Sequence, residues 1–173
     1  RTLAVQDAVL STRSLSPSLA APTRSGLAAA AVGAPATVAV YDAHNGVALP
    51  GTLARRDADP PTGDVAVDEA HDGLRATLDF YAEACSRNSV DDAGLPLVGT
   101  VHYGQGFDNA QWTGTQMLFG DGDGTIFNRF TVAVDVMGHE VTHGVTQYTA
   151  ALRYQRQSGA LNESWSDVFG ELI

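Results

Sequence analysis

The 173-residue sequence contains no lysine, a single cysteine and no long hydrophobic run. One cysteine excludes an internal disulfide and any metal site built from several cysteines. No apolar run approaches the roughly 18 residues that a membrane-spanning helix needs. Ten arginines stand against 20 acidic residues, and a net charge of −10 argues against nucleic acid, because phosphate binding needs clustered basic side chains. Neither a nucleic-acid partner nor a membrane span is therefore expected.

The composition that remains is typical of one globular domain. Hydrophobic residues make up 44% and charged residues 17% of the chain, and the length suits one domain rather than two. Cys85 lies on an apolar stripe with Leu74 and Leu78 at helical spacing, so we predict a small buried core residue rather than a nucleophile. Because the sequence begins with Arg1, it does not show whether a signal peptide exists.

The organisation along the chain predicts an α+β fold. Residues 1–36 are rich in Ala, Ser, Thr, Leu and Pro without a helical or alternating period, which indicates an arm or pro-segment before a folded domain at 37–173. Strand-like and helix-like stretches then alternate with turn signals, and Asp64 is a plausible N-cap. The predicted strands are 37–42, 97–103 and 112–120, and the predicted helices are about 65–87, 133–150 and 160–173.

Two acidic segments raise the question of calcium. Residues 57–72 are rich in acids, and we interpret them as a solvated loop and helix start. Asp121 and Asp123 begin as an EF-hand loop would, but Ile126 and Val132 stand where that loop needs Gly and Glu. Both segments are therefore predicted to be loops or turns. An acidic calcium-binding interaction module remains an alternative function, which predicts calcium-dependent folding that survives His139→Ala.

The stretch HEVTH, residues 139–143, carries the strongest chemical signal. Residues four apart lie on one face of a helix, so His139 and His143 can both reach one Zn²⁺ ion. Glu140 lies about 100° around the helix from His139, where it can contact a metal-bound water as a general base. The spacing thus supplies two ligands and a base.

A catalytic zinc site needs a third protein ligand. Thr146 and Thr149 stand where a class with a third histidine would need Gly and His, so that class is excluded. Glu163 lies twenty residues after His143, far enough for a second helix to return antiparallel and present a carboxylate. Asp167 shares the face of Glu163 and could accept a hydrogen bond from a ligand imidazole.

These motifs together resemble the thermolysin family of zinc metalloendopeptidases from about residue 37 to the end. The similarity rests on "HEVTHGVTQYTAALRYQRQSGALNESWSD", "VHYGQGFDNAQWTG", "LPGTLAR" and "FGDGDG". It implies a zincin-like N-terminal lobe, with a mixed or antiparallel sheet followed by active-site helices. It also implies hydrolysis of peptide bonds before bulky hydrophobic residues. The alternative is a non-catalytic zinc-binding lobe, or an inactive half of such a protease.

The resemblance assigns roles to individual residues. His139, His143 and Glu163 would be the zinc ligands, Glu140 the general base, and Asp167 the residue that orients His139. Tyr154 would help bind the transition-state oxyanion. The substrate would be contacted by the edge-strand residues Asn109, Ala110 and Trp112, and by a pocket of Phe127, Phe130 and Val136, where Phe130 departs from the usual aliphatic residue.

The family also implies features beyond the lobe. Asp135 matches a calcium ligand, so calcium is a possible second cofactor. A helical C-terminal lobe, which would add a histidine and an arginine to the site, is expected as a partner, and the 173 residues alone are expected to show at most trace activity. The resemblance further implies a secreted zymogen whose residues 1–36 are the end of a pro-segment, although no signal peptide is visible.

Overall fold

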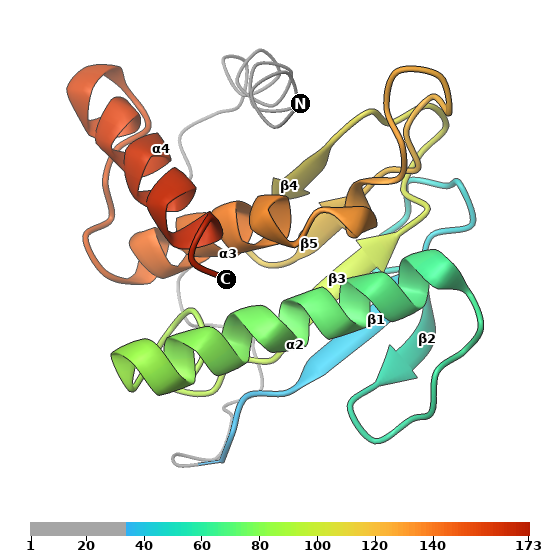
Figure 1. The fold of residues 1–173 in the computed structure, drawn as a ribbon, viewed down its shortest axis with the longest axis horizontal. Helices are drawn as coiled ribbons and strands as arrows, with labels where there is room; N and C mark the ends of the chain where they lie inside the picture. The colour runs from blue at the N-terminus through green and yellow to red at the C-terminus, as the bar shows by residue number, and fades with distance from the viewer. Residues whose placement is uncertain (1–33) are drawn as a thin grey trace.

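The computed structural model describes residues 34–173, so most of the predicted arm lies outside the described residues. The described chain is α+β, as predicted, with a mixed sheet and three long helices (Figure 1). No helix within this range combines the length and apolar character that a membrane crossing requires. The elements are β1 (Val38–Asp42), β2 (Thr52–Arg56), α2 (Val65–Cys85), β3 (Leu97–Val101), β4 (Ala110–Trp112), β5 (Met117–Phe119), η1 (Phe130–Val132), α3 (Val134–Tyr148) and α4 (Arg156–Gly170).

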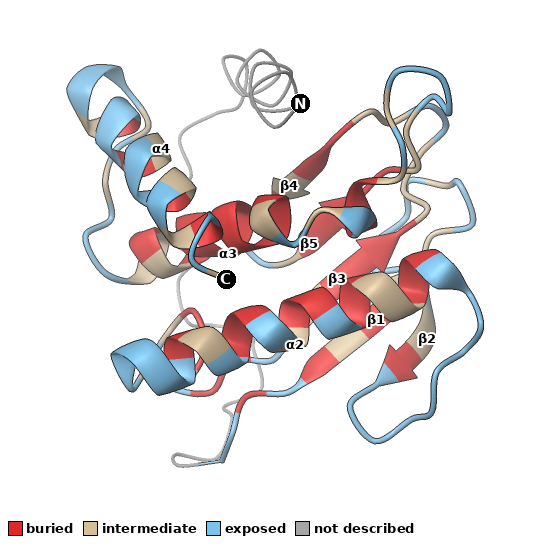
Figure 2. Ribbon diagram, viewed as in Figure 1, coloured by how far each residue is buried: buried red, intermediate tan, exposed pale blue. Residues whose placement is uncertain are grey.

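The five strands form one sheet in the order β2-β1-β3-β5-β4, which leaves β4 at an edge. β1, β3 and β5 run parallel, whereas β2 and β4 pair antiparallel with β1 and β5. Figure 1 shows α2 crossing β1 and β3, α3 beside β4 and β5, and α4 packed on α3. The core lies between the sheet and the two helices α2 and α3, which are buried along the sides that face it (Figure 2).

Helix α2 begins where the sequence predicts. The side chain of Asp64 accepts hydrogen bonds from the amides of Ala66 and Val67, which satisfies two of the donors that a helix start leaves open. The helix is tied to α3 by a buried contact of 2.6 Å between the hydroxyls of Tyr81 and Thr142. Burial raises the pKa of Tyr81 to about 12. Thr142 donates its own proton to the Gly138 carbonyl, so Tyr81 is the donor in this pair.

Two strand predictions require correction. The stretch 112–120 is a hairpin rather than one strand, because β4 ends at Trp112 and β5 begins at Met117. The turn is closed by Thr113, whose hydroxyl accepts from the Gln116 amide at 3.1 Å. Strand β2 was missed, since its sequence TLARR has exposed polar residues and lies at the other edge of the sheet. The alternation of buried and exposed positions is too weak there to indicate a strand.

Cys85 and the acidic segment also differ from the prediction. Cys85 is exposed at the last position of α2, beyond the end of the sheet that covers the rest of the apolar stripe. Acids in the segment 57–72 are paired rather than merely solvated: Asp68 lies 3.2 Å from Arg55, and Glu69 lies 2.5 Å from Arg129. The prediction that Asp123 belongs to a turn is confirmed, because its Oδ1 accepts from three successive backbone amides.

His102 links α2 to the loop that follows β5. Its Nδ1 lies 2.8 Å from Asp121 and its Nε2 lies 3.2 Å from Asp64, the N-cap of α2. Burial opposes protonation, but the hydrogen bonds and charges of Asp121 and then Asp64 outweigh it and raise the pKa of His102. The protonated imidazole can donate to both carboxylates at once.

This link predicts a pH-dependent contribution to stability. Because the folded-state pKa of His102 is raised, its contribution is complete below the ordinary value near ~6.5 and is lost as pH rises through the folded-state value. We expect His102→Gln to lower the free energy of unfolding by about 1 kcal/mol at about pH 5.5 and by less at about pH 9. Urea unfolding at both values measures this, with Glu171→Gln at an exposed position as control. An equal loss at both values would show that the charge of His102 contributes nothing.

Candidate metal centre

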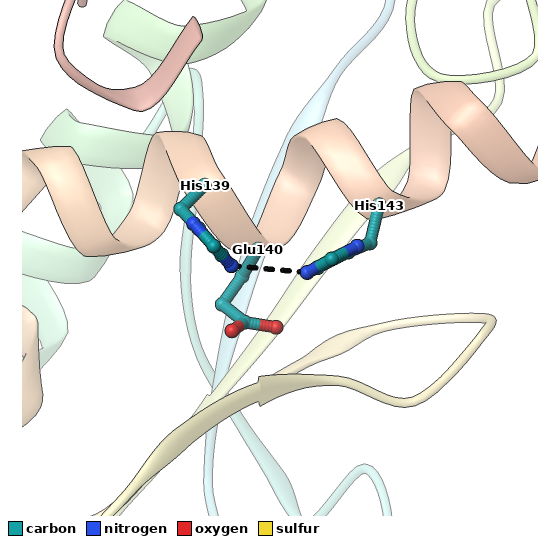
Figure 3. A group of neighbouring side chains, drawn as sticks. All are labelled: His139, Glu140 and His143. Carbon is teal, nitrogen blue, oxygen red and sulfur yellow. Dashed lines mark hydrogen bonds between the residues drawn. The ribbon is translucent and has the colours of Figure 1, made fainter. Parts of the chain in front are cut away.

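Helix α3 presents His139 and His143 on one face. Both side chains are buried, and their Nε2 atoms lie 3.0 Å apart, with the rings pointing toward each other and Glu140 beside them (Figure 3). The spacing of four residues accounts for this arrangement, since it is close to one helical turn. The helix that the sequence predicts around HEVTH is thereby confirmed.

Glu163 reaches the same point from α4. Its Oε2 lies 3.2 Å from Nε2 of His139, and its Oε1 lies 3.4 Å from Nε2 of His143. Helix α4 returns along α3 after the loop 149–155, so the antiparallel arrangement predicted from the twenty-residue separation is present. Three potential ligand atoms on two helices thus converge.

The other ring nitrogens determine what these three atoms can do. Nδ1 of His139 lies 2.9 Å from Asp167 Oδ1, and Nδ1 of His143 lies 2.8 Å from Asn162 Oδ1. Both partners are oxygen acceptors, which favours a proton on each Nδ1, and in that tautomer each ring turns its Nε2 lone pair to the centre. Two lone pairs and a carboxylate that face one another repel unless a cation lies between them.

The dimensions of the cluster fit zinc. With bonds of about 2.0–2.2 Å, a tetrahedral zinc site separates neighbouring ligand atoms by roughly 3.3 Å. The three observed separations are 3.0, 3.2 and 3.4 Å. Two imidazoles and one carboxylate are also the ligand set of a common class of catalytic zinc sites. The residues present therefore fit a zinc ion.

Glu140 is the second carboxylate near the histidines, and its environment differs from that of Glu163. It lies within 4.8 Å of the two ring nitrogens, is fully buried, and its Oε2 accepts from the Trp112 amide at 2.8 Å. Glu163 lies 3.2 and 3.4 Å from the two ring nitrogens, whereas an oxygen of Glu140 is engaged by the Trp112 amide, so Glu163 is the better third ligand. The bond to Trp112 instead fixes Glu140 between α3 and the edge strand.

The edge strand β4 lies beside this cluster. Residues 109 and 113 bond to β5 through the Asn109 carbonyl and the Thr113 amide. Because backbone groups alternate in direction along a strand, those of Ala110 and Trp112 point away from β5, which is where Glu140 meets the Trp112 amide. The Trp112 side chain is 3% exposed and donates to Gln147, so this residue can offer a substrate only backbone groups.

The remaining predicted residues surround the cluster at different depths. The Tyr154 hydroxyl donates to Glu163 Oε1, which places it at the metal centre. Phe127 and Phe130 stack with ring centroids 5.8 Å apart, and they share the core with Val136, one turn before His139. Asp135 lies in the first turn of α3. Within residues 34–173, the cluster around His139 and His143 is the one group of this kind that could hold a metal, and it does not include Asp135.

Sequence reasoning missed the residues that seat α4 on α3. The four buried residues of α4 are Gly159, Asn162, Ser166 and Gly170, whereas its apolar residues Leu161, Trp165 and Val168 are exposed. The signal was available as small and polar residues spaced three and four apart. The exposure of the apolar residues was expected, because the resemblance implies that this face of the helix meets the C-terminal lobe.

Comparisons with known proteins agree with this geometry. Residues 19–147 match the family described as thermolysin metallopeptidase, catalytic domain, and residues 150–173 match the alpha-helical domain of thermolysin metallopeptidases. The chain is 58% identical over 134 residues to an extracellular metalloprotease of Pectobacterium carotovorum subsp. carotovorum, covering 78% of this chain and 39% of that protein.

Two further relatives extend the comparison. Protease PrtS of Photorhabdus sp. (strain Az29) is 58% identical over 134 residues, which are 78% of this chain and 36% of the relative. The structure of the precursor of protealysin, a metalloproteinase from Serratia proteamaculans, matches with a TM-score of 0.80 and 53% identity, over 86% of this chain and 46% of that chain. The chain thus spans less than half the length of each of these three relatives.

Asn162 provides a test of the hydrogen bonds that orient the histidines. Asn162→Ala removes the acceptor at Nδ1 of His143, so the ring can rotate and present the wrong nitrogen. We expect the affinity for Zn²⁺ to fall about 10–100-fold, as for other partners of metal-bound histidines. Competition with a zinc chelator measures the change, and Asn128→Ala at an exposed loop position is the control. An unchanged affinity would show that Ser166, 3.2 Å from the same nitrogen, is sufficient.

Proposed function

The chain belongs to the thermolysin metallopeptidase family, and on this premise we propose that it is the zinc-binding lobe of a metalloendopeptidase. One observation carries the proposal: two imidazole nitrogens and the Glu163 carboxylate converge beside the fully buried carboxylate of Glu140. A metal site with an adjacent base is the equipment that hydrolysis of a peptide bond requires.

Each side chain then has a defined task. His139, His143 and Glu163 hold zinc, and Asp167 and Asn162 keep the two rings in the tautomer that binds it. Bound zinc supplies Lewis acidity and a water whose pKa is lowered to about 7. Glu140 accepts the proton of the attacking water and later delivers it to the leaving amine.

The substrate lies along β4 in this proposal. A peptide in extended form adds to the edge of the sheet, where the backbone of Ala110 and the side chain of Asn109 bind its main chain. The residue after the scissile bond enters a pocket of Phe127, Phe130 and Val136, whose apolar rings favour bulky hydrophobic side chains. The Tyr154 hydroxyl, adjacent to the centre, donates to the developing oxyanion.

Two properties follow from the relatives rather than from the site. The Pectobacterium relative is an extracellular metalloprotease by name, and we propose the same location for this chain. Calcium binding at Asp135 rests on the resemblance alone, and added calcium should raise the melting temperature if it occurs.

Metal binding is the first test. His139→Ala, His143→Ala and Glu163→Ala should each lose zinc, because an open site has only three protein ligands. Glu171→Ala, an exposed glutamate at the end of α4, should keep it. Elemental analysis after dialysis gives the zinc content, and the visible absorption of Co²⁺ reports the geometry. Full zinc occupancy in Glu163→Ala would refute its assignment as a ligand.

Glu140→Gln separates metal binding from catalysis. The glutamine oxygen can still accept from the Trp112 amide, so the fold and the zinc content should persist. The amide cannot take up a proton, so hydrolysis should fall at least about 100-fold. The assay compares cleavage of one apolar peptide at equal zinc occupancy, using the chain alone and joined to a complete alpha-helical domain of the thermolysin metallopeptidase family. If parent and variant cleave equally, the base lies elsewhere; if neither parent form cleaves, the lobe binds zinc without catalysis.

A further inference from the structure

The segment between β5 and α3 carries Phe127 and Phe130, and its start is fixed by local hydrogen bonds. Asp123 Oδ1 accepts from the amides of Thr125, Ile126 and Phe127 at 2.7–2.9 Å. The Phe130 amide then donates to the Gly120 carbonyl at 3.0 Å, which closes the loop back onto the end of β5. These contacts define a turn, but they do not attach it to the helices.

Apolar packing attaches only part of the segment to α2: Phe130 lies in the shared core, whereas Val132 does not. An open hollow of about 570 Å³ lies between α2 and the stretch from η1 to the start of α3. Its walls include Gly73 of α2 and, on the other side, Val132 and Val134, which are 55% and 39% exposed. Met137 packs on Gly73 within this hollow, but Val132 and Val134 leave the side nearer the segment open, so polar contacts supplement the packing there.

A polar cluster spans the hollow at Glu69. The Glu69 carboxylate accepts from Arg129 at both oxygens, with distances of 2.7 Å to Nε and 2.5 Å to Nη2. The Thr131 hydroxyl donates to Glu69 Oε2 at 2.8 Å. The hydrogen bond from Arg129 also lowers the pKa of Glu69, despite partial burial. Such two-point pairs fix orientation as well as distance, because the planar guanidinium matches the carboxylate.

We propose that Glu69, through Arg129 and Thr131, positions the segment that carries Phe127 and Phe130 and thereby sets which side chains the pocket accepts. The two residues that Glu69 binds flank Phe130 on either side in the chain. A glutamate on α2, outside the metal centre, thus acts as a specificity-determining positioning residue. The inference rests on the proposed function, which assigns Phe127 and Phe130 to the substrate pocket.

Glu69→Gln is the informative variant, since it keeps the shape of the side chain and removes its charge. In the zinc-loaded chain of 173 residues, amide hydrogen exchange of residues 124–132 should become about fivefold faster. Zinc content should not change, because Glu69 contacts none of the ligands. Asp79→Asn is the matched control: it removes an ion pair with Arg75 on the same helix, far from the segment in sequence, and should leave the exchange unchanged.

Selectivity is measured with zinc-binding hydroxamates that differ only in one side chain, which is methyl, isobutyl or benzyl. In the parent chain we expect tighter binding of the two larger compounds, and in Glu69→Gln we expect that preference to shrink by about fivefold. The methyl compound, which does not reach the pocket wall, should bind equally to both. The exchanged pair Glu69→Arg with Arg129→Glu should restore the preference, which a loss of general stability would not allow.

The possible outcomes separate this inference from the proposed function. Unchanged exchange in Glu69→Gln, or faster exchange with unchanged selectivity, overturns the role of Glu69 while the pocket assignment stands. A parent chain that shows no side-chain preference refutes the pocket assignment itself and overturns the inference with it. Faster exchange, reduced preference and rescue by the exchanged pair together establish the role.

Discussion

The close crossing of α3 and α4 is the constraint on which the rest of the site depends. At Gly170 an added Cβ would lie 2.6 Å from the Asp135 carbonyl oxygen and 3.0 Å from the His139 amide, so only glycine permits this approach. Gly138 of α3 lies opposite Gly170 and has the same constraint, because a Cβ added to Gly138 would lie 3.1 Å from Gly170 Cα. Glu163 stands two helical turns before Gly170, and the crossing therefore fixes how far its carboxylate reaches toward His139 and His143.

The face that α4 turns to α3 is polar, which links the stability of the helix pair to the metal centre. Asn162 and Ser166 are buried because their side chains contact His143, and Asp167 contacts His139. Buried polar groups of this kind contribute little net stability but cost much when a partner is lost. The apolar residues Leu161, Trp165 and Val168 of α4 are exposed, and Figure 2 shows much of this helix as exposed. The α3–α4 contact is thus organised around chemistry rather than around apolar burial.

Helix α2 has the complementary role of holding the periphery. Its first turns contact the loop after β5 through Asp64 and His102, and they contact the segment before α3 through Glu69. Both contacts are ionic, one through a histidine whose protonation varies with pH and one through an arginine that stays charged. The net charge of the chain is strongly negative, but individual acids are locally neutralised: Arg55 pairs with Asp68 and Arg129 pairs with Glu69.

The sequence by itself determined the cluster of His139, His143 and Glu163, because its information is local. The spacing of His139 and His143 sets their geometry on any helix, and Glu163 follows within one helix–loop–helix unit, so no long-range contact had to be inferred. Other features depend on partners far along the chain. The Trp112 amide binds Glu140 although the two residues are 28 positions apart in the sequence, and Glu69 binds Arg129 across 60 positions. Neither contact can be predicted from the identity of one residue. Only the tertiary structure decided that Cys85 is exposed and that Asn162 and Ser166 of α4 are buried, since burial depends on what packs opposite a face rather than on the face alone.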